Sequence, residues 1–211
     1  MASIILENAV GGIISPDPSW ASWRPQSEPI RSPNQMPEKI QAAELDLQRD
    51  LATYPDLQFA LDYWDAKCRD RFAPARADID PAEIVSILPR VMLADVERSA
   101  DGAVDFRYRL SGTGICNVHR EELTGRRPSS IEPTDYGALI DAHYRIVLER
   151  RRPMAHVIAL QLDQRSASYA RIILPLSSDG QTLDMLMVVD SEKQNTLSEF
   201  VETIRKIGRR R

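Results

Sequence analysis

The sequence has 211 residues, of which 43% are hydrophobic and 27% are charged, and its formal net charge at pH 7 is −4. This length suits one domain with accessory segments, and the apolar fraction is sufficient for a buried core. The negative charge argues against a surface built for nucleic acid, and no apolar run reaches the roughly 20 residues that cross a membrane. The first residues lack the basic start and long apolar run of a signal peptide. Because the only two cysteines, Cys68 and Cys116, cannot build a disulfide framework, we expect a cytoplasmic location.

The N-terminal quarter of the chain divides into two segments of different composition. Six prolines lie within residues 1–37, and proline removes a backbone donor and restricts the residue before it. We therefore expect residues 1–37 to form a flexible arm outside the folded core. Good helix formers follow, and Ile40, Ala43, Leu47 and Leu51 recur at helical spacing, which predicts an N-terminal helix over residues 38–55.

Helical and strand patterns alternate through the middle of the chain. A helix is expected from Leu57 to Phe72, followed by two strands on either side of an Asp101-Gly102 turn. After a Gly-punctuated helical stretch, a longer helix ends before Pro153, because proline cannot continue a helix. Three strand patterns close this region, at residues 154–162, 167–176 and 183–189.

A capping box, Thr196-Leu-Ser-Glu199, begins the last segment of the chain. A Ser or Thr followed three residues later by Glu satisfies the free backbone donors of a first helical turn. Apolar residues then recur on one face, so the sequence predicts an amphipathic C-terminal helix over residues 196–211.

Several motifs of the middle region resemble a known family. The segment from Phe106 to Thr113, FRYRLSGT, and the segment from Glu121 to Arg126, EELTGR, resemble the second strand and following helical region of a PAS domain. Tyr63-Trp64, Asp78-Ile79-Asp80-Pro81 and Leu88-Pro89 are similar to the single-domain PAS family of alphaproteobacterial type. The resemblance implies an α+β fold in which a five-stranded antiparallel sheet carries helices on one face. It places the PAS domain at residues 56–191, with flanking N- and C-terminal helices.

The resemblance also implies a class of function. PAS domains sense or couple rather than catalyse, so we expect a stand-alone sensory or regulatory module that binds a small molecule or a signalling protein. In such a fold the ligand pocket lies between the helices and the sheet. The candidate ligand-binding residues are those whose polar groups suit a pocket, namely Tyr108, Tyr136, His143, Tyr144 and Arg171, with Tyr169 as a further hydroxyl. The alternative interpretation is that they are packing residues with polar tips.

Two alternative functions carry different chemistry. The long PAS helix supplies the axial histidine in haem-binding oxygen sensors, so His143 makes a haem sensor conceivable, although a histidine on an apolar face is more often a core residue. An enzyme is not expected, because the sequence lacks a phosphate-binding glycine loop and a recognisable nucleophile constellation. Cys116 and His119 lack the second pair of ligands that a structural zinc site needs. We expect neither a cofactor nor a metal.

The strand patterns after Pro153 are apolar on both faces, whereas a sheet covered on one face alternates apolar and polar residues. The second face therefore needs a cover: the helix from Leu57 to Phe72, the C-terminal helix or a second subunit. The resemblance favours a homodimer built on this helix, with Phe59, Tyr63 and Trp64 at the interface.

Overall fold

The computed structural model describes residues 3–6, 39–119, 121–132, 134–162, 165–193 and 195–196. The C-terminal helix predicted for residues 196–211 falls outside these ranges, apart from Thr196. None of the helices in the described part of the chain is long and apolar enough to span a membrane.

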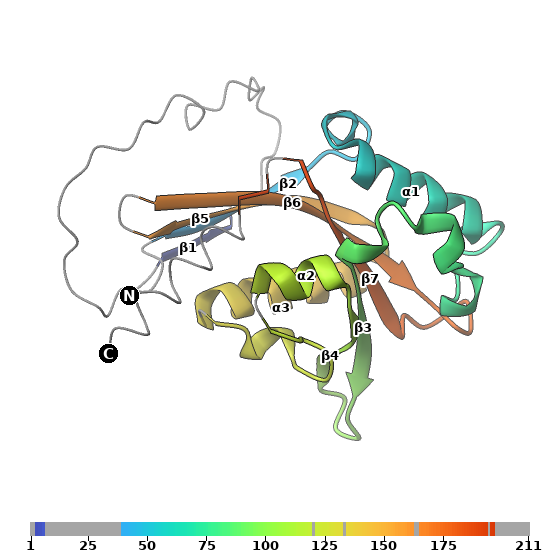
Figure 1. The fold of residues 1–211 in the computed structure, drawn as a ribbon. Helices are drawn as coiled ribbons and strands as arrows, with labels where there is room; N and C mark the ends of the chain where they lie inside the picture. Colours follow the sequence, from blue (N-terminus) through green and yellow to red (C-terminus); the bar gives the residue numbers. More distant parts are fainter. Residues whose placement is uncertain are drawn as a thin grey trace.

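One open sheet forms the framework of the molecule (Figure 1). In the described residues it has seven strands in the order β1-β2-β5-β6-β7-β3-β4, and every neighbouring pair is antiparallel except β1 and β2. The α+β fold with an antiparallel sheet is therefore confirmed. The strands are β1 (Ser3–Leu6), β2 (Lys39–Leu45), β3 (Val91–Arg98), β4 (Val104–Ser111), β5 (Met154–Leu162), β6 (Arg165–Leu176) and β7 (Met185–Asp190).

In the described residues, helices pack on one face of this sheet, as expected for the PAS fold, and a further helix covers the other face (Figure 1). Helices α2 (Thr113–His119) and α3 (Thr134–Arg150) cover the face that we call the inner face. Helix α1 (Pro55–Cys68) covers the outer face, together with residues around two 3-10 turns, η1 (Leu51–Thr53) and η3 (Pro81–Ile84). Three further turns are η2 (Arg76–Asp78), η4 (Leu88–Arg90) and η5 (Pro128–Ser130).

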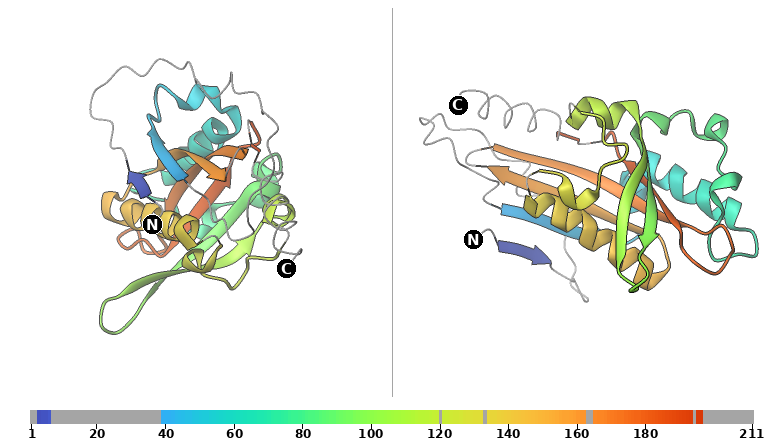
Figure 2. Two further views of the ribbon diagram at one scale, coloured as in Figure 1. Left: turned by 90° about the vertical axis from the view of Figure 1, so that its left-hand side faces the viewer. Right: turned by 90° about the horizontal axis from the view of Figure 1, so that it is seen from below.

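The N-terminal segments take a different form from the one predicted. Residues 39–45 form strand β2 rather than part of a helix over 38–55, because they pair with the edge of β5 along seven residues, from Lys39↔Gln161 to Leu45↔Ala155. Pairing along a whole sheet edge outweighs the modest helix propensity of this segment. Ser3–Leu6 then adds β1 in parallel beside β2, so this piece of the predicted arm belongs to the sheet (Figure 2). The remainder of the arm lies outside the described residues.

The outer face of the sheet is covered within the chain. Trp64 of α1 is 5% exposed and donates its indole Nε1–H to the carbonyl of Pro175 over 2.7 Å. Of the three covers considered for this face, the one that the described residues show is helix α1. The apolar second face was one reason for expecting a dimer, and α1 covers it; the dimer itself stays a prediction. Trp64 is a core residue rather than an exposed interface residue, while Phe59 is 39% exposed and stacks on Tyr63.

Candidate functional site

A group of polar side chains lies buried between the inner face of the sheet and α3. Strand β6 supplies its centre, Arg171, which is 1% exposed. In the sheet register Arg171 stands directly opposite His156 of β5 on one side and Asp190 of β7 on the other. Because alternate residues of a strand point to opposite faces, Tyr169 and Arg171 share the inner face of β6. This cross-strand row places three ionisable side chains next to one another in a sheet whose buried residues are mostly apolar.

Helix α3 covers the site on the inner face of the sheet. Tyr136, His143 and Tyr144 are seven and eight residues apart, which places them on one side of the helix, and all three are buried. Strand β4 contributes Tyr108, which is 2% exposed. We call the eight residues the inner polar cluster: Tyr108, Tyr136, His143, Tyr144, His156, Tyr169, Arg171 and Asp190.

Hydrogen bonds link most members of the inner polar cluster. Arg171 Nη2 lies 2.8 Å from His143 Nδ1, and the His143 ring stacks on His156 with 3.8 Å between ring centroids. Tyr136 and Tyr169 share a hydrogen bond of 2.5 Å between their hydroxyls. Tyr108 and Tyr144 share a longer one of 3.3 Å. The arrangement orients the Arg171 guanidinium but does not use all of its donors.

Three buried atoms in this cluster lack a hydrogen-bond partner: Arg171 Nε, His156 Nδ1 and Asp190 Oδ1. Buried polar atoms in proteins are satisfied in about nine cases of ten, so three orphaned atoms on three adjacent strands need an explanation. Leaving such an atom unpaired costs about 1–3 kcal/mol, and more for a charged group. A bound polar molecule or water is the natural partner for such atoms.

Burial controls the protonation states in the cluster. It raises the pKa of Asp190 to about 7, although the positive charges of Arg171 and Arg90 act in the opposite direction. Burial and the charge of Arg171 lower the pKa of His156 to about 3 and that of His143 further still. Burial opposes the charge on Arg171, but the surrounding tyrosine oxygens and Asp190 outweigh it and raise its pKa. At neutral pH the cluster therefore holds one permanent cation, two neutral histidines and one acid near its titration midpoint.

A small pocket reaches this cluster from beside α2. Its volume is about 190 Å³, and Asp190 belongs both to the pocket wall and to the cluster. The remainder of the wall is formed by Arg90, Gly114, Ile115, Val118, Glu192 and Asn195. Asp190 is thus the residue that the pocket wall and the buried cluster share, and it stands opposite Arg171 in the strand register.

The family of the chain follows from a comparison over most of its length. A family model of the PAS domain matches residues 53–189. The range predicted for the domain from the sequence was 56–191. The chain belongs to the PAS domain family. Its five PAS strands are β3 to β7, and the inner polar cluster lies between PAS helices and sheet, where the family resemblance implied a pocket. No curated protein matches the chain.

The five ligand-binding candidates predicted from the sequence all lie in the inner polar cluster of this PAS domain. The structure brings Tyr108, Tyr136, His143, Tyr144 and Arg171 together from three separate elements. Their role in binding stays a prediction. Sequence reasoning did not select His156 and Asp190, although a titratable residue within or at the end of a largely apolar strand was a signal for each.

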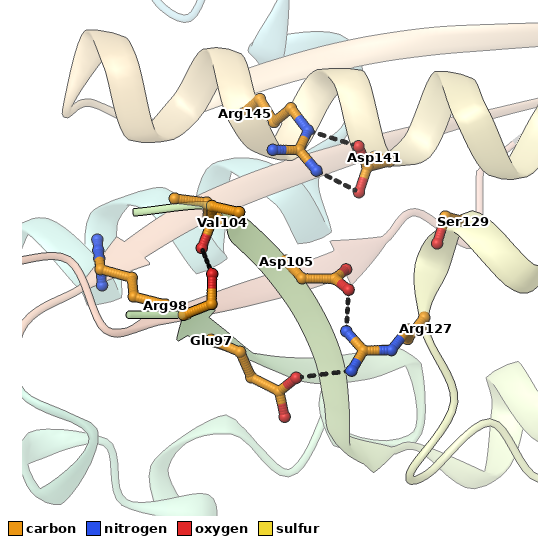
Figure 3. Close-up of a pocket in the computed structure, with 10 residues that line it drawn as sticks. Glu97, Arg98, Val104, Asp105, Arg127, Ser129, Asp141 and Arg145 are labelled. Atoms are coloured by element: carbon orange, nitrogen blue, oxygen red, sulfur yellow. Dashed lines mark hydrogen bonds and ion pairs between the residues drawn. The ribbon is translucent and has the colours of Figure 1, made fainter. Parts of the chain in front are cut away.

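A larger pocket of about 530 Å³ lies at the surface, between the β3–β4 hairpin and α3 (Figure 3). Apart from Arg98, which donates to the Leu183 carbonyl, its charged side chains are already paired with one another. Arg127 lies 3.0 Å from Glu97 and also contacts Asp105, while Arg145 bonds to Asp141 at 2.6 Å. Exposed pairs of this kind contribute little binding energy and show no preference for one sign of charge. We therefore place the candidate site at the smaller pocket, whose wall includes Asp190, one of the three residues with an orphaned atom.

The surroundings of His143 do not suit an axial haem ligand. Arginine can only donate hydrogen bonds, so Nδ1 of His143 accepts from Arg171 and the neutral ring carries its proton on Nε2. A nitrogen that carries a proton has no free electron pair for iron. One face of the ring is also occupied by His156. Within the described residues, no group of three or more His, Cys, Asp or Glu side chains could hold a metal ion.

Proposed function

We propose that this PAS domain is a regulatory module that binds a small molecule at the inner polar cluster and has no catalytic activity of its own. The observation that carries the proposal is the set of three orphaned polar atoms around a fully buried arginine. A core that served packing alone would gain stability by replacing such groups with apolar ones. A polar ligand that reaches these atoms would recover the hydrogen bonds that they lack.

A set of contacts connects the site with the outer helix and supports a regulatory role. The carbonyl of Asp190 accepts a hydrogen bond from Arg90 Nε over 3.1 Å, and Arg90 Nη2 lies 3.3 Å from Asp56 in the first turn of α1. Asp56 also accepts hydrogen bonds of 2.8 Å from the hydroxyl of Ser191 and the amide of Glu192. A ligand that displaces the end of β7 would therefore move contacts that hold α1.

We also propose that the aromatic pair on α1, the exposed Phe59 and the half-buried Tyr63, is where a second copy of the chain docks. Phe59 is one of the few exposed large apolar side chains in the described residues. Phe59→Ser is expected to lower the fraction of homodimer in native mass spectrometry. Asp65→Ser, an exposed change on the same helix, is the matched control and leaves that fraction unchanged. Equal dimer fractions in both variants would remove this face as the interface.

A second candidate function is catalysis at the same site, because the cluster brings ionisable groups with displaced pKa values together. Asp190 has a pKa of about 7 and could exchange a proton with a molecule in the pocket. His143 and His156 do not line the pocket, and they are only 1% and 4% exposed. Since Asp190 is the one cluster residue on the wall of that pocket, the geometry favours binding over acid–base chemistry.

Native mass spectrometry of the protein purified from its own host tests the proposed function. We expect a bound small molecule as extra mass on the wild type and on Arg145→Gln, an exposed arginine on α3. Arg171→Gln removes the buried cation and is expected to lose that mass. Should Arg171→Gln fail to fold, as judged by circular dichroism, Tyr136→Phe serves instead with partial loss. A wild type that carries no added mass, or equal retention in all variants, would contradict the proposal. Conversion of the captured molecule during incubation would indicate an enzyme.

A further inference from the structure

We infer, building on the function proposed above, that the ligand is a small organic carboxylate held by Arg171, and that Asp190 takes up one proton from solvent when this anion binds. The ligand carboxylate and an ionised Asp190 then never face the Arg171 cation at the same time. Ligand binding and the protonation of Asp190 are linked, because the ligand carboxylate replaces the Asp190 carboxylate as the negative charge near Arg171.

The Arg171 guanidinium lacks a full counter-ion in the described structure. Its Nη2 donates to a neutral acceptor, His143 Nδ1, and its Nε donor has no partner. No described carboxylate lies within ion-pair distance of it, although Asp190 is opposite in the strand register. A buried charge without an anion is unfavourable, and a planar carboxylate fits the guanidinium fork well. An anion is therefore the ligand that relieves the largest electrostatic cost at this site.

Asp190 is the competing anion. Its Oδ1 is buried without a partner, and burial raises its pKa to about 7. A second negative charge beside it makes the neutral acid more favourable still. The charged and titratable groups around Asp190 come from β6, α3, η4 and the pocket rim: Arg171, Tyr169, Tyr136, Tyr144, Arg90 and Glu192. The tyrosines are neutral and Arg90 is paired with Asp56 and Glu192, so Asp190 is the group free to change charge.

The pocket suits a small ligand. Its 190 Å³ would hold about six waters at roughly 30 Å³ each. Ile115 and Val118 of α2 give one part of the wall an apolar surface. A short aliphatic or single-ring acid matches this combination, with its apolar part under α2 and its carboxylate beside Asp190, the wall residue that stands opposite Arg171 in the strand register.

Calorimetric titration with matched acids and amides tests this inference on the full-length protein. The probes are propionate and benzoate, with propionamide and benzamide as uncharged counterparts of the same shape. From a pKa of about 7 for Asp190, one-proton linkage predicts about tenfold weaker binding of each carboxylate at pH 8 than at pH 6. The amides are expected to bind at least tenfold more weakly than the acids at pH 6. Heats in buffers of different ionisation enthalpy should show uptake of one proton at pH 8.

Two variants separate the role of Asp190 from general electrostatics. Asp190→Asn resembles the protonated acid, so it should bind carboxylates equally at both pH values, with the affinity that the wild type has at pH 6. Glu192→Gln removes another negative charge from the same pocket wall and should keep the pH dependence. Circular dichroism shows that each variant is folded before titration.

Distinct outcomes would overturn this inference without ending the functional proposal. Amides that bind as tightly as acids, or weaker binding in Asp190→Asn, would exclude the proposed charge exchange. Failure of every carboxylate to bind at millimolar concentration would do the same. A neutral molecule found on host-purified protein would preserve ligand binding but reject an anion. Absence of any molecule there would reject the proposed function itself.

Discussion

Replacing Trp64 with alanine is expected to lower the free energy of unfolding by about 3–5 kcal/mol, the usual cost of deleting a large buried aromatic side chain. Trp64 is 5% exposed, packs against the outer face of the sheet and holds the Pro175 carbonyl through its indole nitrogen. The substitution leaves both a cavity and an unsatisfied carbonyl. Urea denaturation followed by circular dichroism measures the change.

Phe59→Ala is the matched control for this prediction, because Phe59 lies on the same helix and is 39% exposed. We expect it to lower the free energy of unfolding by about 1 kcal/mol or less, as surface changes usually do. Equal losses in the two variants would show that α1 does not cover the sheet as described. A wild-type midpoint that rises with protein concentration is the result expected of the homodimer proposed above.

Acidification from pH 6 to pH 5 is expected to destabilise the protein through His143 and His156. Their folded pKa values lie well below the usual value of about 6.5. The unfolded chain therefore binds two protons that the folded chain does not, and stability is lost as the pH falls below 6.5. Asp190 works in the opposite direction, because its raised pKa of about 7 lets the folded state keep a proton that the unfolded state releases. The net difference approaches one proton, or about 1.4 kcal/mol per pH unit.

Variants give the sign of each contribution to this pH dependence. Asp190→Asn removes the opposing proton, so the acid loss should steepen toward two protons per molecule. His156→Asn removes one histidine and should flatten the curve. Chemical denaturation at several pH values between 5 and 7 provides the free energies. The lowered pKa values of surface carboxylates such as Asp50, Asp78 and Glu97 add to the acid loss mainly below pH 5, where the unfolded carboxylates take up protons. A flatter curve in Asp190→Asn would contradict the assigned protonation states.

Most elements of the PAS domain could be predicted from local patterns. Residues 154–162 were predicted as a strand and form β5 with the same bounds, because β-branched and aliphatic residues, preceded by a proline, leave little choice. The predicted helix before Pro153 is α3. The two apolar faces of the closing strands also indicated correctly that both faces are covered, since Ile158 packs on the inner side and Ala155 on the outer side.

Strand β2 could not be predicted from its own residues. Ile40 and Ala43 fit a helical period, but Ile40 and Ala42 fit a strand period equally well. The choice is made by the free edge of β5, which lies more than a hundred residues further along the chain. A short segment with only a weak preference for helix or strand takes the conformation that pairing with a distant strand requires.

The inner polar cluster was predicted in part, and the missing residues have a common cause. Tyr136, His143 and Tyr144 stand out on the face of an amphipathic helix, so periodicity finds them. His156 and Asp190 gain their importance from the strand register, which sets them on either side of Arg171. Register depends on the pairing of distant segments, and a single sequence shows it poorly.

A high-resolution crystal structure of the protein purified from its own host tests the central claim most directly. We predict density for a small non-protein molecule in contact with Arg171 Nε and Asp190 Oδ1, the atoms that lack partners in the described structure. A direct Arg171–Asp190 ion pair with every buried polar atom satisfied by the protein, and no space for a ligand, would contradict it.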